Sequence, residues 1–116
     1  MTTYKGSCHC GDVRFEVELE PEKVIACNCS ICSRMGWWLA FVGSEQFTQV
    51  SGESALTDYQ FGKEHIHHPF CRRCGAHTFS HGLNERGERL YSINVRCLAG
   101  VDLEKLEVIP HDGLSA

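Results

Sequence analysis

The sequence predicts an all-β domain of many short strands with little helix. Hydrophobic residues alternate with polar ones along much of the chain, which is the period of a strand with one face in a core. Short apolar runs are separated by Gly, Pro, Ser and Asn, and no apolar pattern of helical period continues over three turns. The chain has 116 residues and no internal repeat, so we expect one domain over residues 1–116.

The first two predicted strands cover residues 13–19 and 24–26. In the first, apolar residues alternate with arginine and glutamate, so one face is expected in the core and the other in solvent. Pro21 marks the turn that follows it. After the second strand, residues 30–35 favour a single helical turn with Ser30 as its cap.

Further strands follow from short apolar or alternating runs. They are predicted at residues 39–42, 47–50, 56–61, 65–70, 78–80, 91–95 and 106–109. Pro69 cannot donate a backbone hydrogen bond, which favours an edge position for strand 65–70. Asn and Gly within residues 84–87 predict a hairpin loop, and residues 101–106 favour a short helical turn.

Charge and hydropathy disfavour nucleic acid and membrane as partners. The net charge is −4, and no basic stripe is present to neutralise phosphates. The longest apolar run, residues 35–42, is far shorter than the roughly 20 residues that cross a bilayer. The first residues contain no apolar leader segment. We therefore expect a cytoplasmic protein, in which thiols stay reduced.

Cysteine spacing is the strongest chemical signal in the chain. Seven of the eight cysteines fall into three tight groups: Cys8 and Cys10, then Cys27, Cys29 and Cys32, then Cys71 and Cys74. Thiolates two or three residues apart can converge on one ion at a Zn–S distance of about 2.3 Å. A disulfide between such close neighbours would be strained. The spacing therefore predicts zinc binding.

The first and last groups form two pairs, each followed directly by glycine. Glycine allows the tight backbone turns that aim amide groups at sulfur. Two pairs make one four-cysteine site, and sites of this type are closed and structural. We pair Cys8 and Cys10 with Cys71 and Cys74.

The middle group has no fourth cysteine of its own. Three protein ligands with one open position are typical of a catalytic zinc, so Cys27, Cys29 and Cys32 are the candidate reactive site. The alternative is a second structural site that is closed by Cys97 or by a histidine. Cys97 follows a predicted strand, and we expect it in the core.

Several other polar residues are weaker candidates. His65, His67 and His68 are expected at the surface or in local hydrogen bonds, with one of them reaching the open site as the alternative. Arg34 and Arg96 are candidates to pair with a substrate carboxylate, although a solvated arginine is the default.

Four stretches of the sequence resemble the family of glutathione-dependent formaldehyde-activating enzymes, also called the centromere-protein-V-like family. They are residues 6–16, 27–32, 70–77 and 94–98, in the family's order. The resemblance implies a β-tent fold of several small antiparallel sheets organised around zinc. It also implies two zinc ions, a structural one on Cys8, Cys10, Cys71 and Cys74 and a catalytic-type one on Cys27, Cys29 and Cys32.

The named activity of that family joins glutathione to formaldehyde and gives S-hydroxymethylglutathione, which is a carbon–sulfur lyase reaction. The resemblance therefore implies that this chain adds a small thiol, glutathione or similar, to formaldehyde or another aldehyde. Three thiolates leave a net charge of −1 on the zinc, which favours thiolate delivery over carbonyl polarisation. His65, His67 and His77 are candidates to protonate the resulting alkoxide.

Two rival functions remain open at this point. In the first, both metals serve the fold, and the domain is a non-catalytic zinc module that carries a thiol or binds a protein partner. In the second, a metal-bound water makes the protein a hydrolase, but no HExxH motif or carboxylate pair accompanies the cysteines. The oligomeric state is not predicted.

Overall fold

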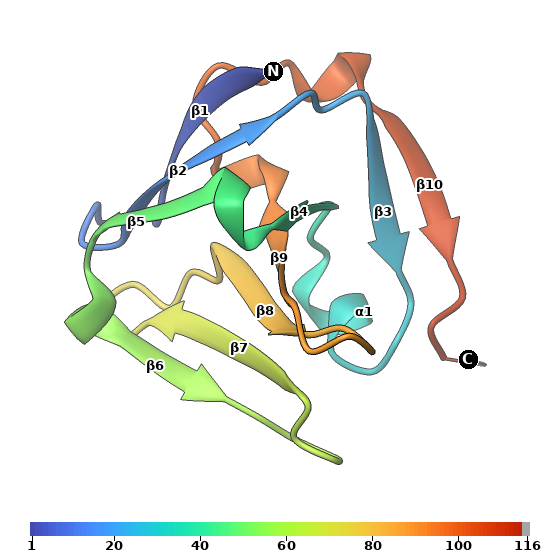
Figure 1. Cartoon of the computed structure of the whole chain (residues 1–116). Helices are drawn as coiled ribbons and strands as arrows, with labels where there is room; N and C mark the ends of the chain where they lie inside the picture. Colours follow the sequence, from blue (N-terminus) through green and yellow to red (C-terminus); the bar gives the residue numbers. More distant parts are fainter. Residues whose placement is uncertain (115–116) are drawn as a thin grey trace.

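The structure, a computed structural model, describes residues 1–114, and strands dominate it (Figure 1). The strands are β1 (Thr2–Ser7), β2 (Arg14–Leu19), β3 (Lys23–Cys27), β4 (Leu39–Gly43), β5 (Phe47–Ser51), β6 (Leu56–Tyr59), β7 (Ile66–Cys71), β8 (Phe79–Leu83), β9 (Arg89–Asn94) and β10 (Glu107–His111). The helical pieces are α1 (Cys32–Met35), η1 (Ser44–Gln46), η2 (Glu53–Ala55), η3 (Val95–Cys97) and η4 (Leu103–Lys105). The predicted all-β class is confirmed.

The strands form two sheets. One has the order β1-β2-β5, and the other has the order β10-β3-β4-β9-β8-β7-β6. All neighbours are antiparallel except β10, which runs parallel to β3. In Figure 1 these two strands lie side by side with their arrows pointing the same way. The expected antiparallel sheets are therefore correct apart from this pair, which joins strands from opposite ends of the chain.

The main core is built on β2 and aromatic residues from three other strands. Phe15 is 1% exposed, and its ring lies 5.4 Å from that of Phe47 and 5.7 Å from that of Phe79. Phe47 also stacks on Tyr91 at 4.1 Å. Because Phe15 and Phe47 come from one sheet and Phe79 and Tyr91 from the other, this cluster holds the two sheets together by apolar burial.

The predicted hairpin loop and the short helical turn near the end of the chain are both present. The loop joins β8 to β9, and it is closed by a hydrogen bond from the Asn84 amide to the Glu88 carbonyl at 2.8 Å. The helical turn is η4, and the Asp102 side chain accepts a hydrogen bond from the backbone amide of Glu104 at its start.

Strand 65–70 is not the edge strand that Pro69 suggested. It corresponds to β7, which lies between β6 and β8. Proline is tolerated because β7 pairs with β8 only at Ile66 and His67, so that ladder ends before Pro69. The edges of this sheet are β6 and β10.

Two further details differ from the sequence-based expectation. Ser30 does not cap the helical turn, because α1 begins at Cys32 with Ile31 as its N-cap and no side chain caps it. Strand β1 was not expected, since its sequence lacks regular apolar alternation. It forms because its backbone pairs with β2 along the full length from Thr2 to Ser7.

None of the helices within residues 1–114 is long and apolar enough to span a membrane.

In the turn before η2, we expect that adding one methyl group lowers the stability of the protein strongly. Gly52 has φ +87°, and a Cβ there would lie 2.1 Å from the Asp12 carbonyl oxygen. Gly87 has φ +79° with nothing within 4 Å. We expect Gly87→Ala to cost about 1–2 kcal/mol from backbone strain alone, and Gly52→Ala to cost clearly more because backbone must also move. Urea unfolding of the metal-loaded protein measures both, and equal losses would contradict this account.

Candidate functional site

Two loops bring four cysteine sulfurs together. The Sγ atoms of Cys8, Cys10, Cys71 and Cys74 all lie within 4.8 Å of one another. The sulfur of Cys10 is 3.7 Å from that of Cys8 and 3.6 Å from that of Cys71. Four sulfurs at the Zn–S distance of about 2.3 Å in a tetrahedron are separated by roughly 3.8 Å. The donor set and its spacing therefore fit one tetrahedral thiophilic ion, and this grouping is the predicted one.

Glycine turns shape both loops. Cys8 directly follows β1, and Cys71 is the last residue of β7. Gly11 has φ +87° and Gly75 has φ +79°, which is left-handed backbone that side-chain-bearing residues rarely adopt. Each turn reverses the chain within a few residues, so both cysteines of a pair face the same point.

Backbone amides stabilise negative charge on these sulfurs. The Val13 amide donates a hydrogen bond to the Cys8 sulfur at 3.3 Å. Hydrogen bonds with the backbone of Ala76 and of Cys10 lower the pKa of the Cys74 thiol to about 6. Amide donors aimed at sulfur are a regular feature of metal-thiolate sites, so the surroundings of this cluster also fit a bound ion.

The second group of sulfurs belongs to the turn between β3 and α1. Cys27 is the last residue of β3, and Cys32 is the first residue of α1. The Sγ atoms of Cys27, Cys29 and Cys32 lie within 4.8 Å of one another. In the part of the chain that the structure describes, no fourth Cys, His, Asp or Glu joins this group at that spacing. The geometry fits a metal held by three thiolates with one position left over.

Cys97 does not close this second group. Its sulfur donates a weak hydrogen bond to the His77 carbonyl at 3.9 Å. Burial raises the pKa of its thiol to about 11, with a further contribution from the charges of Cys8 and Cys74. Cys97 therefore lies on the side of the four-cysteine cluster as a half-buried thiol, and it is not among the buried core residues that were expected to include it.

The segment after β10 holds the three-cysteine turn in place. The Asn28 amide donates to the His111 carbonyl at 3.1 Å, and the Leu114 amide donates to the Asn28 side chain at 3.0 Å. Gly113 passes so close that a Cβ there would lie 2.6 Å from the Cys27 sulfur. Both the hydrogen bonds and the missing side chain allow this segment to pack on the cysteine turn.

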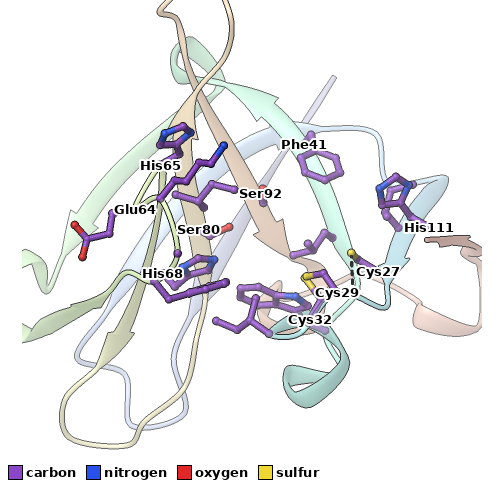
Figure 2. A pocket seen from close by; sticks show the side chains of 18 residues that line it. Cys27, Cys29, Cys32, Phe41, Glu64, His65, His68, Ser80, Ser92 and His111 are labelled. Atoms are coloured by element: carbon purple, nitrogen blue, oxygen red, sulfur yellow. Dashed lines mark hydrogen bonds between the residues drawn. The ribbon is translucent and has the colours of Figure 1, made fainter. Parts of the chain in front are cut away.

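A cavity of about 370 Å³ adjoins the three-cysteine group. Figure 2 shows Cys27, Cys29 and Cys32 on one side of it, with Glu64 and His65 on the opposite side. Its walls are mainly apolar and include Ile25, Ile31, Trp37, Leu39, Phe41 and Phe61. The three sulfurs are therefore accessible from a hollow that can hold a small organic molecule.

The candidate histidines differ in whether they line the cavity. Among them, His65 lines the cavity, whereas His67 and His77 are not part of its lining. His67 instead bonds the Asp58 carboxylate, and burial lowers the pKa of the His77 imidazole. His111 lines the cavity as well, although sequence reasoning did not select it as a site residue.

His68 is the site residue that sequence reasoning underestimated. It is 5% exposed and lines the cavity. Its Nδ1 lies 3.0 Å from the carbonyl oxygen of Tyr59. A carbonyl can only accept, so Nδ1 carries a proton, and in the neutral form of the imidazole the lone pair is on Nε2. The alternation of β7 gave one signal, because His67 and His68 must face opposite sides of the strand.

The candidate arginines also lie outside the cavity lining. The Arg34 guanidinium donates to the Ser30 carbonyl at 2.7 Å. The Arg96 guanidinium stacks over the ring of Trp38 at 4.1 Å. Arg34 lines a neighbouring pocket that shares Ile31 and Phe61 with the cavity.

The two cysteine groups predict different responses to mutation. We expect two zinc ions per chain in the native protein, and one in Cys29→Ser with the fold retained. We expect Cys74→Ser to lose the other ion and to lower the melting temperature strongly, because this cluster is partly buried and joins both sheets. Elemental analysis with thermal unfolding measures both effects. One zinc per chain in both the native protein and Cys29→Ser would contradict a loaded three-cysteine site.

Comparison with known proteins agrees with these features. The sequence model of the family described as glutathione-dependent formaldehyde-activating enzyme matches residues 3–110. A Halomonas elongata protein named "Putative glutathione-dependent formaldehyde-activating enzyme" is 33% identical over 81 residues, which cover 62% of this chain and 52% of that protein. The chain thus spans about half the length of that curated relative.

A solved structure is also similar. The crystal structure of a Rhodobacter sphaeroides protein matches with a TM-score of 0.80 and 38% identity, and the match covers 91% of this chain and 97% of that one. Because the family match extends over nearly the whole sequence, this chain belongs to the family of glutathione-dependent formaldehyde-activating enzymes.

Proposed function

We propose that this protein adds a small thiol, glutathione or a similar compound, to formaldehyde or another aldehyde, with Cys27, Cys29 and Cys32 as the reactive site. The observation that carries this proposal is the position of three convergent sulfurs beside a cavity, with no fourth ligand among the described residues. The family membership supports the same chemistry. In this reaction class a carbon–sulfur bond forms, the carbonyl π bond breaks, and the thiol proton passes to the oxygen.

Three cysteines are a suitable donor set for zinc at such a site. A zinc ion held there supplies a lowered thiol pKa, so that a thiolate forms at neutral pH. The three cysteines would hold such an ion beside the cavity, and the segment around Gly113 packs on the turn that carries Cys27. The second proposed ion, on the four-cysteine cluster, serves the fold.

The cavity walls contribute by excluding water. Trp37 and Leu39 are 3% and 5% exposed and lie beside Cys32 in a small apolar cluster. Removing water from around a thiolate and an aldehyde limits the competing hydration of the carbonyl and strengthens electrostatic interactions in the cavity. These residues therefore hold the two reactants together in a dry space.

We assign the proton transfer to His68. Its Nδ1–H is held by the Tyr59 carbonyl, and the imidazole lies in the cavity lining. The remaining nitrogen, Nε2, can take the proton of the incoming thiol and return it to the alkoxide oxygen of the product. His65 lines the same cavity but is exposed to solvent, so it is less well fixed for this role.

Cysteine substitution tests the reactive site. We expect the native protein to consume formaldehyde in the presence of glutathione or another small thiol above the spontaneous rate, and Cys29→Ser to return the reaction to that rate. Cys97→Ser is the matched control, since Cys97 does not line the cavity. Undiminished turnover by Cys29→Ser would refute the proposal. Retained thiol binding without any acceleration by the native protein would favour a thiol carrier instead.

Substitutions of two neighbouring histidines on β7 test the assigned proton transfer. Gln at position 68 keeps an N–H donor for the Tyr59 carbonyl but has no titratable nitrogen, so we expect His68→Gln to lower kcat by about 100-fold. His67→Gln is the control, because His67 does not line the cavity. Zinc content and melting temperature should stay close to native in both. A kcat equal to that of the native protein in His68→Gln would exclude this role.

A further inference from the structure

We propose that the substrate partner at the three-cysteine site carries an apolar aliphatic or aromatic group that fills the adjoining cavity. This inference rests on the proposed function and narrows its substrate class. Glutathione itself then becomes a poor ligand for this chain, and a hydrophobic thiol, or the adduct of such a thiol with an aldehyde, becomes the preferred one.

Apolar side chains form both the interior and the rim of the cavity. Trp37 and Leu39 are buried in its interior. At the rim, Phe41, Phe61 and Ile66 are 57%, 39% and 50% exposed. They come from β4, from the loop after β6 and from β7. Large apolar side chains from three separate segments thus surround one opening, and an apolar ligand there would remove them from water.

Charged groups that would bind glutathione are scarce around the cavity. Glutathione carries two carboxylates and one ammonium group, which need charged or hydrogen-bonding partners when they leave water. The polar groups of the lining are Lys63 with Glu64 next to it, two serines and three histidines, and Lys63 is the one ammonium or guanidinium group among them. Arg34 lies outside this lining, in a neighbouring pocket where its guanidinium donates to the Ser30 carbonyl, and Arg96 stacks over Trp38. The net charge of −4 also disfavours an anionic ligand.

Polar groups in the middle of the cavity suit an aldehyde oxygen better than a peptide. Ser80 and Ser92 face each other across the β8–β9 pair, and both line the cavity together with His68 (Figure 2). Two hydroxyls and one imidazole can bind a single oxygen atom. They do not provide partners for the two carboxylates, the ammonium and the amides of glutathione.

The volume of the cavity is compatible with an aromatic or medium-length aliphatic group. An apolar cavity of about 150 Å³ is enough for benzene. The cavity here measures about 370 Å³. It therefore has space for a ring of that size together with the sulfur and the aldehyde carbon at the cysteine end. The addition needs no further reactant, because the thiol proton moves to the carbonyl oxygen as the carbon–sulfur bond forms.

Three probe compounds distinguish the contribution of a thiol to binding from that of an apolar group. Benzyl mercaptan has both, glutathione has the thiol without the ring, and benzyl alcohol has the ring without the thiol. Binding to the zinc-loaded protein can be followed by tryptophan fluorescence, because Trp37 lines the cavity. Burial of the ring should make benzyl mercaptan bind about 100-fold more tightly than glutathione. Equal affinities for these two thiols would overturn the proposal.

Rim variants test whether the cavity causes the preference. We expect Phe41→Ser to weaken benzyl mercaptan binding about 10-fold and to leave glutathione binding unchanged. Leu83→Ser is the control, since Leu83 is 65% exposed and lies outside the cavity lining. Equal weakening of both thiols by Phe41→Ser, or weakening of benzyl mercaptan binding by Leu83→Ser, would contradict a specific apolar site.

Activity measurements distinguish this inference from the proposed function. Tight binding of benzyl mercaptan with no thiol-dependent aldehyde turnover would contradict the proposed function and support the apolar preference. Aldehyde turnover that depends on Cys29, with equal affinity for glutathione and benzyl mercaptan, would support the proposed function and overturn the apolar preference.

Discussion

The four-cysteine cluster is the constraint on which the arrangement of the two sheets depends. Cys8 and Cys10 follow β1 in the smaller sheet, whereas Cys71 ends β7 in the larger one. Cys10 and Cys71 are 61 residues apart in the sequence, yet their sulfurs are 3.6 Å apart. Four thiolates this close repel one another unless a cation neutralises them. The metal ion proposed for this cluster would therefore couple directly to folding.

The three-cysteine turn is held by the larger sheet, because Cys27 ends β3 and pairs with His111 of β10. It is anchored by β3 before it, by α1 after it and by the segment after β10 that bonds Asn28. Its other side opens on the cavity. A turn that is fixed on one side and accessible on the other can keep three sulfurs in position while a ligand enters and leaves.

Cysteine pattern and cavity walls carry different parts of the function. The cysteine pattern lies within the residues that match the family model, and the proposed chemistry depends on it. The cavity walls, which include Phe41 at the rim and Trp37 in the interior, would determine which substrate binds. Membership of a family therefore does not settle the substrate. The apolar lining is the basis for proposing a ligand unlike glutathione in this chain.

Local patterns in the sequence determined the alternation of strand 13–19, the hairpin loop at 84–87 and the cysteine spacing, because each depends on residues close together in the chain. Only the tertiary structure decided that β7 is an internal strand and that His68 lies in the cavity wall. Strand neighbours and cavities arise from contacts between distant segments, so the alternation of β7 separated His67 from His68 but could not show which of them faces a cavity.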